Sequence, residues 1–364
     1  MDILSSDDGI VLSVNIIALI TSFLIILSEG VSRISKRDSS KLRAAIVFFI
    51  TIVVSLVIGL RDETVGIDTS SYAYMFREGQ NTRYVYVTGD IGWDAFVYLF
   101  SSLTSNVSIF FVFNAFIYTA APFIGLKNKL GYNLCFLLAL TLLSPNFVQF
   151  GINVMRQGLA ASIFLFALKY YDTDKKILMY TLMGLSIAAH MSMIAPFIGL
   201  LIITMRGTIK RGHALGLILI WTLLLLFTIA GLNNWADYFP FLGGRLLGYS
   251  AGTSGVEAKI FNVPINFWRY SALPVVLYLF FLVKGIKIDR FYTNLGSVYV
   301  LCSCIYILTF SFSYSLRFAY LSEFLMPLLI VYPVLTFRPI KNSSLLLSVM
   351  ITLLAVAKVV TGLD

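Results

Sequence analysis

Long apolar runs, recurring along nearly the whole chain, are the feature that most limits how this sequence can fold. Runs of 17 to 22 residues recur from Ile10 to Gly362, and a helix of about 20 residues is long enough to cross a bilayer core. The sequence is 59% hydrophobic and only 12% charged, which exceeds what a soluble core requires. We therefore expect an all-α, polytopic integral membrane protein that forms a single domain over residues 1–364.

The apolar runs predict about 11–12 transmembrane helices. Two runs, 177–190 and 191–205, are short and meet at His190. They form either a re-entrant hairpin or one long tilted helix, and the hairpin is favoured because a single helix would invert every later loop. The first run follows three aspartates rather than a basic leader, so we expect a retained span. The predicted spans are residues 10–28, 44–60, 105–126, 131–148, 152–171, 177–190, 191–205, 214–231, 267–283, 293–311, 318–337 and 344–361.

Basic residues indicate how these spans are oriented. Most of the excess behind the net charge of +9 lies in alternate short connections, where the positive-inside rule assigns it to the cytoplasm. Nucleic acid is therefore not an expected partner. The three cysteines lie inside apolar runs and are expected to pack in the core. Two longer loops are expected on the opposite side, at residues 61–104, with an interfacial helix, and at residues 232–266.

Nine of the 27 basic residues are left on the outer side, and seven of these nine are arginines. Arg156 and Arg317 each lie inside an apolar run, where an arginine costs about 2.5 to 3.5 kcal/mol at mid-membrane unless it has a partner or water. One interpretation is an internal ion pair, for example Arg317 with Glu323 or a loop aspartate, or a side chain that extends to the outer interface. The other is a phosphate site, because the guanidinium fits phosphate with two parallel hydrogen bonds.

His190 lies between two apolar segments in SIAAHMSMIAP. A histidine in this setting either donates a packing hydrogen bond between helices or acts as a phosphate ligand or proton acceptor near an outer cavity.

The segment GLRDETVGIDTSSYAYMF, residues 59–76, begins where a span leaves the membrane. Gly66 suits a tight turn. Asp68 either caps a short helix that begins at Thr69 or acts as a proton acceptor. The segment gathers Arg61, Asp62, Glu63, Asp68 and Tyr72, but no two carboxylates have a convincing metal-ligand spacing, so no metal site is predicted.

Three short motifs, in this order, resemble the EpsG-like branch of bacterial polysaccharide polymerases, which is related in role to the Wzy O-antigen polymerases. The first is R-x-x-x-x-G-x-D-x-x-x-Y over residues 61–72, the second is M-R-Q-G-L-A around Arg156 and Gln157, and the third is A-A-H-M-S at His190. Arg317 with Tyr320 is a weaker fourth match. The resemblance spans roughly residues 50–330.

The resemblance implies a fold of the GT-C kind and a metal-independent glycosyltransferase without a cofactor. Its donor would be an undecaprenyl-diphosphate-linked oligosaccharide, joined to a second lipid-linked repeat unit at the outer face of a bacterial inner (cytoplasmic) membrane. Membrane lipid is an expected partner, and a chain-length regulator protein is a candidate partner.

This chemistry assigns three kinds of role to the candidate residues. The diphosphate leaving group needs charge neutralisation, and the acceptor hydroxyl needs a proton acceptor, for which Asp68 is favoured over Asp62, Glu63 and His190. The expected catalytic residues are Asp68, His190 and Arg61; the diphosphate ligands are Arg156, Arg317, Arg61 and Gln157; and the sugar-binding aromatics are Tyr72, Trp93, Trp235 and Tyr320.

Three other functions compete with this interpretation. A lipid-linked oligosaccharide flippase handles the same diphosphate, but it needs charge along a path that opens to both sides. An O-antigen ligase uses the same donor, and sequence alone distinguishes it poorly from a polymerase. A membrane acyltransferase is less favoured because its catalytic histidine would face a cytoplasmic acyl donor, whereas His190 is expected on the outer side.

Overall fold

The computed structural model describes residues 6–35, 40–81, 88–205, 207, 209–231, 259–260, 263–310, 312 and 315–362. Within these residues the only strands are β1 (Lys259–Ile260) and β2 (Val263–Pro264), which pair antiparallel. Seven helical segments in the described ranges are long and apolar enough to cross a membrane, and four shorter apolar helices accompany them. The expected all-α, polytopic membrane fold is confirmed.

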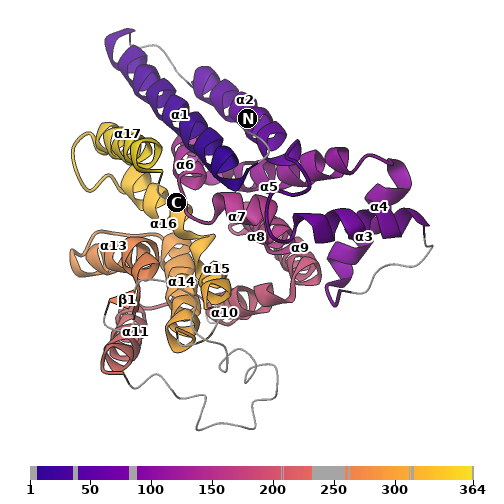
Figure 1. Ribbon diagram of the computed structural model, residues 1–364. Coiled ribbons are helices and arrows are strands. Elements are labelled where there is room, and N and C mark those ends of the chain that lie inside the picture. Colours follow the sequence, from indigo (N-terminus) through magenta and orange to yellow (C-terminus); the bar gives the residue numbers. More distant parts are fainter. Residues whose placement is uncertain are drawn as a thin grey trace, which may run out of the picture. The chain divides into compact units, whose positions relative to one another are not determined.

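The chain divides into two compact units, of which unit 1 comprises Met1–Met193 and Val334–Asp364. Within it α5 packs between α2 and α8, α8 packs on α9, and α1 packs on α2, α6 and α17. The helices α3 and α4 lie side by side (Figure 1). The elements of unit 1 are α1 (Asp7–Ser35), α2 (Ser40–Gly59), α3 (Thr69–Asn81), α4 (Ile91–Leu103), α5 (Val107–Leu130), α6 (Leu134–Leu142), α7 (Phe147–Ile152), α8 (Met155–Ala167), α9 (Lys176–Ala189) and α17 (Ser343–Thr361), with 3-10 turns at Gly131–Asn133, Leu168–Tyr170 and Met191–Met193.

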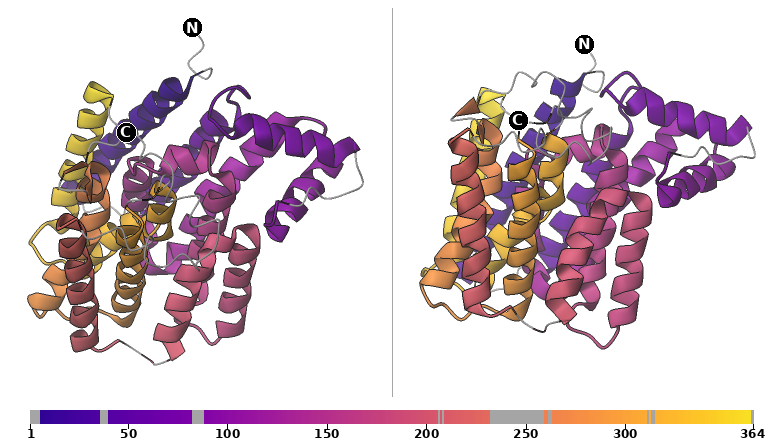
Figure 2. Two further views of the ribbon diagram at one scale, coloured as in Figure 1. Left: turned by 60° about the horizontal axis from the view of Figure 1, so that its bottom comes forward. Right: turned by 90° about the horizontal axis from the view of Figure 1, so that it is seen from below.

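Unit 2, Ile194–Pro333, is built around one mostly buried helix, α14 (Arg290–Leu308). This helix packs against α10, α11, α13 and α15 (Figure 2). The Trp221 indole N–H donates to the Ser303 hydroxyl at 2.9 Å and so links α11 to α14. The other elements are α10 (Ile194–Met205), α11 (Arg211–Ile229), the β1–β2 pair, a π-helical turn at Phe267–Ser271, α13 (Ala272–Val283), α15 (Leu316–Glu323) and α16 (Met326–Thr336), whose last three residues belong to unit 1.

The helices follow the predicted apolar runs with two informative interruptions. Residues 131–148 were expected to form one span, but α6 ends at Leu142, because Pro145 lacks an N–H and disfavours helical backbone at Ser144. Residues 177–205 form α9 and α10, and His190 between them is extended, with φ −159° and ψ 120°. The predicted interruption at His190 is therefore confirmed.

The predicted loop at 61–104 contains two helices. One of them, α4, lies where the interfacial helix was expected, and α3 begins at Thr69 as the capping interpretation of Asp68 required. Gly66 has a φ of +87°, a conformation that favours glycine, and its N–H donates to the Asp7 carboxylate at 2.7 Å. The tight turn predicted at Gly66 is thus present.

An aromatic core holds these two helices against the membrane helices. It joins α3, α4, α5 and α8 through Tyr72, Phe76, Trp93, Phe110, Phe111 and Met155. The rings of Tyr72 and Trp93 meet edge to face with centroids 5.3 Å apart, an arrangement that aromatic pairs prefer. This core fixes the positions of the residues just before α4 and at the start of α8, where the polar site lies.

Candidate functional site

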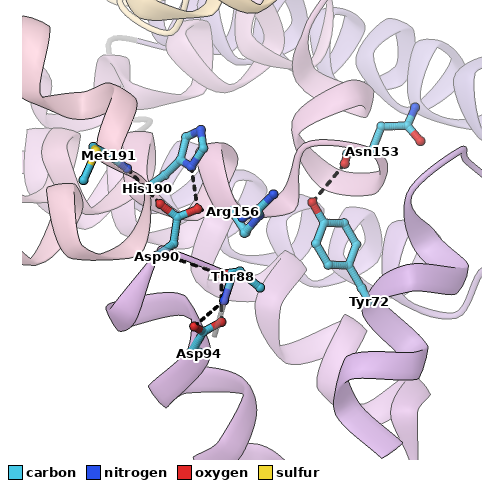
Figure 3. A network of polar contacts seen from close by, with 8 residues as sticks. All are labelled: Tyr72, Thr88, Asp90, Asp94, Asn153, Arg156, His190 and Met191. Atoms are coloured by element: carbon cyan, nitrogen blue, oxygen red, sulfur yellow. Dashed lines mark hydrogen bonds and ion pairs between the residues drawn. The ribbon is translucent and has the colours of Figure 1, made fainter. Parts of the chain in front are cut away.

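The centre of the site is the carboxylate of Asp90, whose side chain is only 7% exposed. Its Oδ2 accepts hydrogen bonds from Arg156 Nη1 at 2.7 Å and from His190 Nδ1 at 2.9 Å. Its Oδ1 accepts from the backbone N–H of Met191 at 3.1 Å. Figure 3 shows the three donors converging on this one group. A buried carboxylate therefore organises residues that are 66 and 100 positions away in the chain.

Local structure before α4 turns Asp90 toward these partners. Asp90 holds the N-cap position of α4, but its side chain makes no capping hydrogen bond. The neighbouring Asp94 instead accepts from the Thr88 N–H and hydroxyl, both at 2.8 Å, and this clamps the loop. Because Asp94 holds the loop, both oxygens of Asp90 are available to groups on other helices.

Gly92 allows α4 to approach the end of α9 closely. A Cβ at Gly92 would lie 2.7 Å from the Ala188 carbonyl carbon and 2.8 Å from the Ala189 nitrogen, which is shorter than any normal van der Waals contact. The absence of a side chain at this position thus lets Asp90 reach His190.

His190 ends α9 in an extended conformation, and this has two consequences. The chain leaves the helix, so the Met191 N–H is directed to Asp90 instead of to a helical carbonyl. An ionised carboxylate can only accept hydrogen bonds, so the ring donates through Nδ1–H. The other nitrogen, Nε2, is then left to accept a proton in the neutral ring, and the side chain is 26% exposed.

Arg156 is the second residue of α8, and its side chain is 30% exposed. An internal ion pair, which the sequence allowed for an arginine inside an apolar run, is present, with Asp90 as the partner. Tyr72 lies beside Arg156, on the side away from Asp90 (Figure 3). Burial raises the pKa of Tyr72, and the charge of Arg156 opposes that shift. The Tyr72 hydroxyl donates to the Asn153 carbonyl at 3.0 Å (Figure 3).

The carboxylate of Asp90 is charged at neutral pH. Burial opposes ionisation, but hydrogen bonds from His190 and Met191 and the charge of Arg156 outweigh it and lower the pKa of Asp90 below its ordinary value of 3.8. Asp90 and Arg156 therefore form a charged pair rather than a neutral one.

Arg61, expected to act in catalysis and to bind the diphosphate, is enclosed in the protein with 2% of its surface exposed. Its guanidinium donates to the Ile58 carbonyl at 2.7 Å and to the Thr69 hydroxyl at 3.3 Å, and it lies 4.4 Å from the Phe111 ring centroid. Burial lowers the pKa of Arg61 to about 10, so it stays charged. In this structure Arg61 ties α2 to α3 and α5.

Trp93, expected to stack on a sugar, is fully buried in the aromatic core, so its ring faces are covered by protein. Its indole N–H is one of several buried polar groups that have no hydrogen-bond partner within the described residues. Four of these atoms lie within three residues of Asp90, Arg156 or His190 in the sequence. They are Trp93 Nε1, Asn153 Oδ1, Gln157 Nε2 and Ser192 Oγ.

The acidic residues of the 59–76 segment have separate environments. Asp62 is exposed and accepts from the Thr64 N–H at 2.9 Å within its own turn, and Glu63 pairs with Arg77. Asp68 is half-buried just before α3. In the described parts of the chain, no three His, Cys, Asp or Glu side chains gather as metal ligands would.

The remaining candidates lie outside unit 1. Arg317 is exposed at the start of α15, and Tyr320 is buried in the same helix, both in unit 2. Glu323, one suggested partner of Arg317, accepts from the Ser271 hydroxyl. Trp235 lies outside the described residues.

Sequence reasoning missed Asp90, the residue that organises the site. Asp90 follows a glycine in VTGDIGW, and that local pattern is typical of a helix cap. The only available signal was indirect: an arginine inside an apolar run requires a counter-charge, and Asp90 is one of few acidic residues in the outer loops.

The fold and site together define a polytopic helical membrane protein with a charged Asp–Arg–His network beside its membrane helices. The family model for the EpsG family matches residues 44–363, and the protein belongs to this family. EpsG-like proteins are Wzy-type polysaccharide polymerases, so this chain has a general role of that kind. The search of curated proteins found no match, and the search of solved structures found none.

Proposed function

We propose that the protein joins undecaprenyl-diphosphate-linked oligosaccharide repeat units into a polysaccharide at the outer face of a bacterial inner membrane. Membership of the EpsG family supports a polymerase. The observation that carries the chemistry is that Arg156 and His190 both contact Oδ2 of Asp90. A cation for the leaving group and a base for the acceptor, held by one carboxylate, are the groups that this transfer needs.

In the proposed step, the acceptor hydroxyl attacks the anomeric carbon of the donor's reducing-end sugar. The bond from that carbon to the diphosphate oxygen breaks, and its electron pair stays on the diphosphate. Arg156 neutralises the charge that develops there. His190 Nε2 takes the hydroxyl proton, and the ionised Asp90 holds the Nδ1–H and stabilises the imidazolium that forms.

We favour His190 over Asp68 as the proton acceptor because Asp90 orients the ring and fixes which nitrogen is free. Asp68 is kept as the alternative base. The buried amide of Gln157 is a further proposed diphosphate ligand, since its Nε2 has no partner among the described side chains and backbone. Arg61 and Tyr72 are proposed as positioning residues, because both are buried and their polar groups donate to protein atoms.

The unpartnered polar atoms near the site support a polar ligand. Buried donors and acceptors in native proteins are almost always paired with protein, water or ligand. Sugar hydroxyls and phosphate oxygens offer the complementary groups, which a purely apolar lipid does not.

Reconstitution with a purified lipid-linked repeat unit tests the proposal. We expect a ladder of longer lipid-linked glycans from vesicles that contain the protein alone. Movement of the donor across the bilayer without elongation would indicate a flippase and overturn the proposal, and transfer to a lipid A core without a ladder would indicate a ligase.

Three further results belong to the same assay. EDTA is expected to leave elongation unchanged, and strict dependence on added magnesium would contradict a transfer that relies on Arg156 for charge neutralisation. Arg317→Ala is expected to abolish elongation at normal membrane levels, and normal elongation by this variant would exclude Arg317 as a diphosphate ligand. A chain-length regulator is expected to shift only the ladder's length distribution.

A further inference from the structure

A groove of about 610 Å³ lies between α2 and α5 in unit 1. Its walls are apolar, formed mainly by Val47, Phe48, Phe116, Phe123 and Ile124. The volume is within the range of sites that hold small molecules. Because two helices that are long and apolar enough to cross a membrane form it, lipids are the molecules expected to surround it.

One end of the groove carries positive charge. Lys41, at the start of α2, and Lys127, near the end of α5, both line the groove and are exposed. Neither lysine forms an ion pair with any described residue, whereas a third lining cation, Arg43, is buried and pairs with Glu29 at 2.6 Å. Two lysines that have no ion-pair partner among the described residues therefore lie at one end of the apolar groove.

This end is far from the Asp90 site. Asp90 and its partners lie near the other ends of the same helices, where Arg61 follows α2 and contacts Phe111 near the start of α5. The 20-residue α2 is about 30 Å long at a rise of about 1.5 Å per residue, which is the thickness of a bilayer core. The groove is thus distinct from the proposed glycosyl-transfer site.

We propose that this groove binds one anionic glycerophospholipid, with its phosphate between Lys41 and Lys127 and an acyl chain along Phe48, Phe116 and Phe123. Charge complementarity identifies the occupant: a phosphate headgroup matches the two lysines, and the aromatic walls match the chain. Basic residues just beyond a membrane helix attract anionic lipids in this way. The inference stands independently of the polymerase activity.

The test uses the full-length protein in vesicles of phosphatidylcholine with a minor fraction of phosphatidylglycerol. Phosphatidylglycerol that remains bound after detergent extraction is counted by native mass spectrometry. Lys41→Gln combined with Lys127→Gln is compared with Lys284→Gln combined with Lys287→Gln, a matched pair of exposed lysines in unit 2. Ala120→Phe, which fills the groove, is compared with Ala357→Phe on an exposed face of α17.

We expect the first lysine pair to weaken phosphatidylglycerol binding roughly 30-fold, since each lysine near a membrane surface contributes about 1 kcal/mol. The control pair and Ala357→Phe should bind as the wild type does, and Ala120→Phe should lose the lipid. Inorganic phosphate should not displace it, because the acyl chain supplies part of the affinity. Equal retention by all variants, or displacement by phosphate alone, would overturn the proposal.

The single variants Lys41→Gln and Lys127→Gln, each checked by thermal unfolding, cover the case in which the double variant does not fold. Each should show an intermediate loss of binding, and wild-type retention in both folded single variants would also overturn the proposal.

Discussion

Arg156 Nη1 and His190 Nδ1 donate to the same atom, Oδ2 of Asp90, at 2.7 Å and 2.9 Å. These contacts bring together the start of α8, the end of α9 and the residue before α4. One carboxylate thereby sets the spacing between a cation and a base, and its loss would affect both.

Asp90→Asn is expected to lower elongation at least about 100-fold while the protein still reaches the membrane. The amide keeps the size of the carboxylate but no longer favours Nδ1–H or stabilises the imidazolium, and positioned proton transfer is worth about 10²–10⁴-fold. The rate of chain elongation with saturating donor measures this loss. Asp62→Asn, an exposed aspartate in the nearby turn, is the control, and near-normal elongation by Asp90→Asn would refute the orienting role.

Arg156→Lys should impair elongation less than Arg156→Ala does. Lysine keeps the charge but lacks the planar fork that binds phosphate, so we expect elongation to fall about tenfold for lysine and to be lost for alanine. Arg156→Ala also leaves the buried Asp90 carboxylate without its cation, and removing one partner of such a pair costs up to about 3–5 kcal/mol.

Membrane levels and thermal unfolding separate the two effects of the Arg156 substitutions. An equally folded Arg156→Ala variant that elongates normally would exclude the arginine from the phosphate site.

Gly92→Ala is expected to destabilise unit 1 and to reduce elongation, because the new Cβ would meet the Ala188 and Ala189 backbone at 2.7–2.8 Å. The displaced α4 would carry Asp90 away from His190. Gly184→Ala within α9 is the matched control, since no atom lies within 4 Å of its Cβ position and alanine favours a helix by about 1 kcal/mol. The melting temperature should fall for Gly92→Ala and rise for Gly184→Ala. Shifts of the same sign would contradict the close packing at Gly92.

The stability that Asp90 contributes should depend on pH in the acid range. Its native pKa lies below the ordinary 3.8, so the unfolded chain takes up the proton first as pH falls. The contribution is therefore complete above the ordinary pKa and is lost as pH falls through the lower native value. The difference in melting temperature between the wild type and Asp90→Asn should shrink as the pH falls below about 4. A constant difference down to the native pKa would mean that Asp90 is not ionised in its pair.

Much of the fold could be predicted because its causes are local. A bilayer of fixed thickness requires apolar runs of fixed length, and these runs place the membrane helices of the structure. The turn at Gly66, the start of α3 at Thr69 and the interruption at His190 follow from the backbone preferences of a few adjacent residues. The break after Leu142 was missed, although Pro145 was a local signal for it.

The site depended on contacts that no local pattern contains. The sequence identified Arg156 and His190 as unusual, since a charged or titratable group inside an apolar run needs a partner. It did not identify that partner, because Asp90 is 66 and 100 residues away from them and resembles an ordinary helix cap. The burial of Arg61 and Trp93 was equally hidden, because it results from the packing of α3 and α4 against α5 and α8.

The sequence by itself thus determined the membrane class, the helical architecture and the family resemblance, since hydrophobic length and short motifs are properties of contiguous residues. Only the tertiary structure decided which charges meet. Packing at Gly92 and within the aromatic core brings Asp90 to Arg156 and His190, and a buried carboxylate is stable only where such partners surround it.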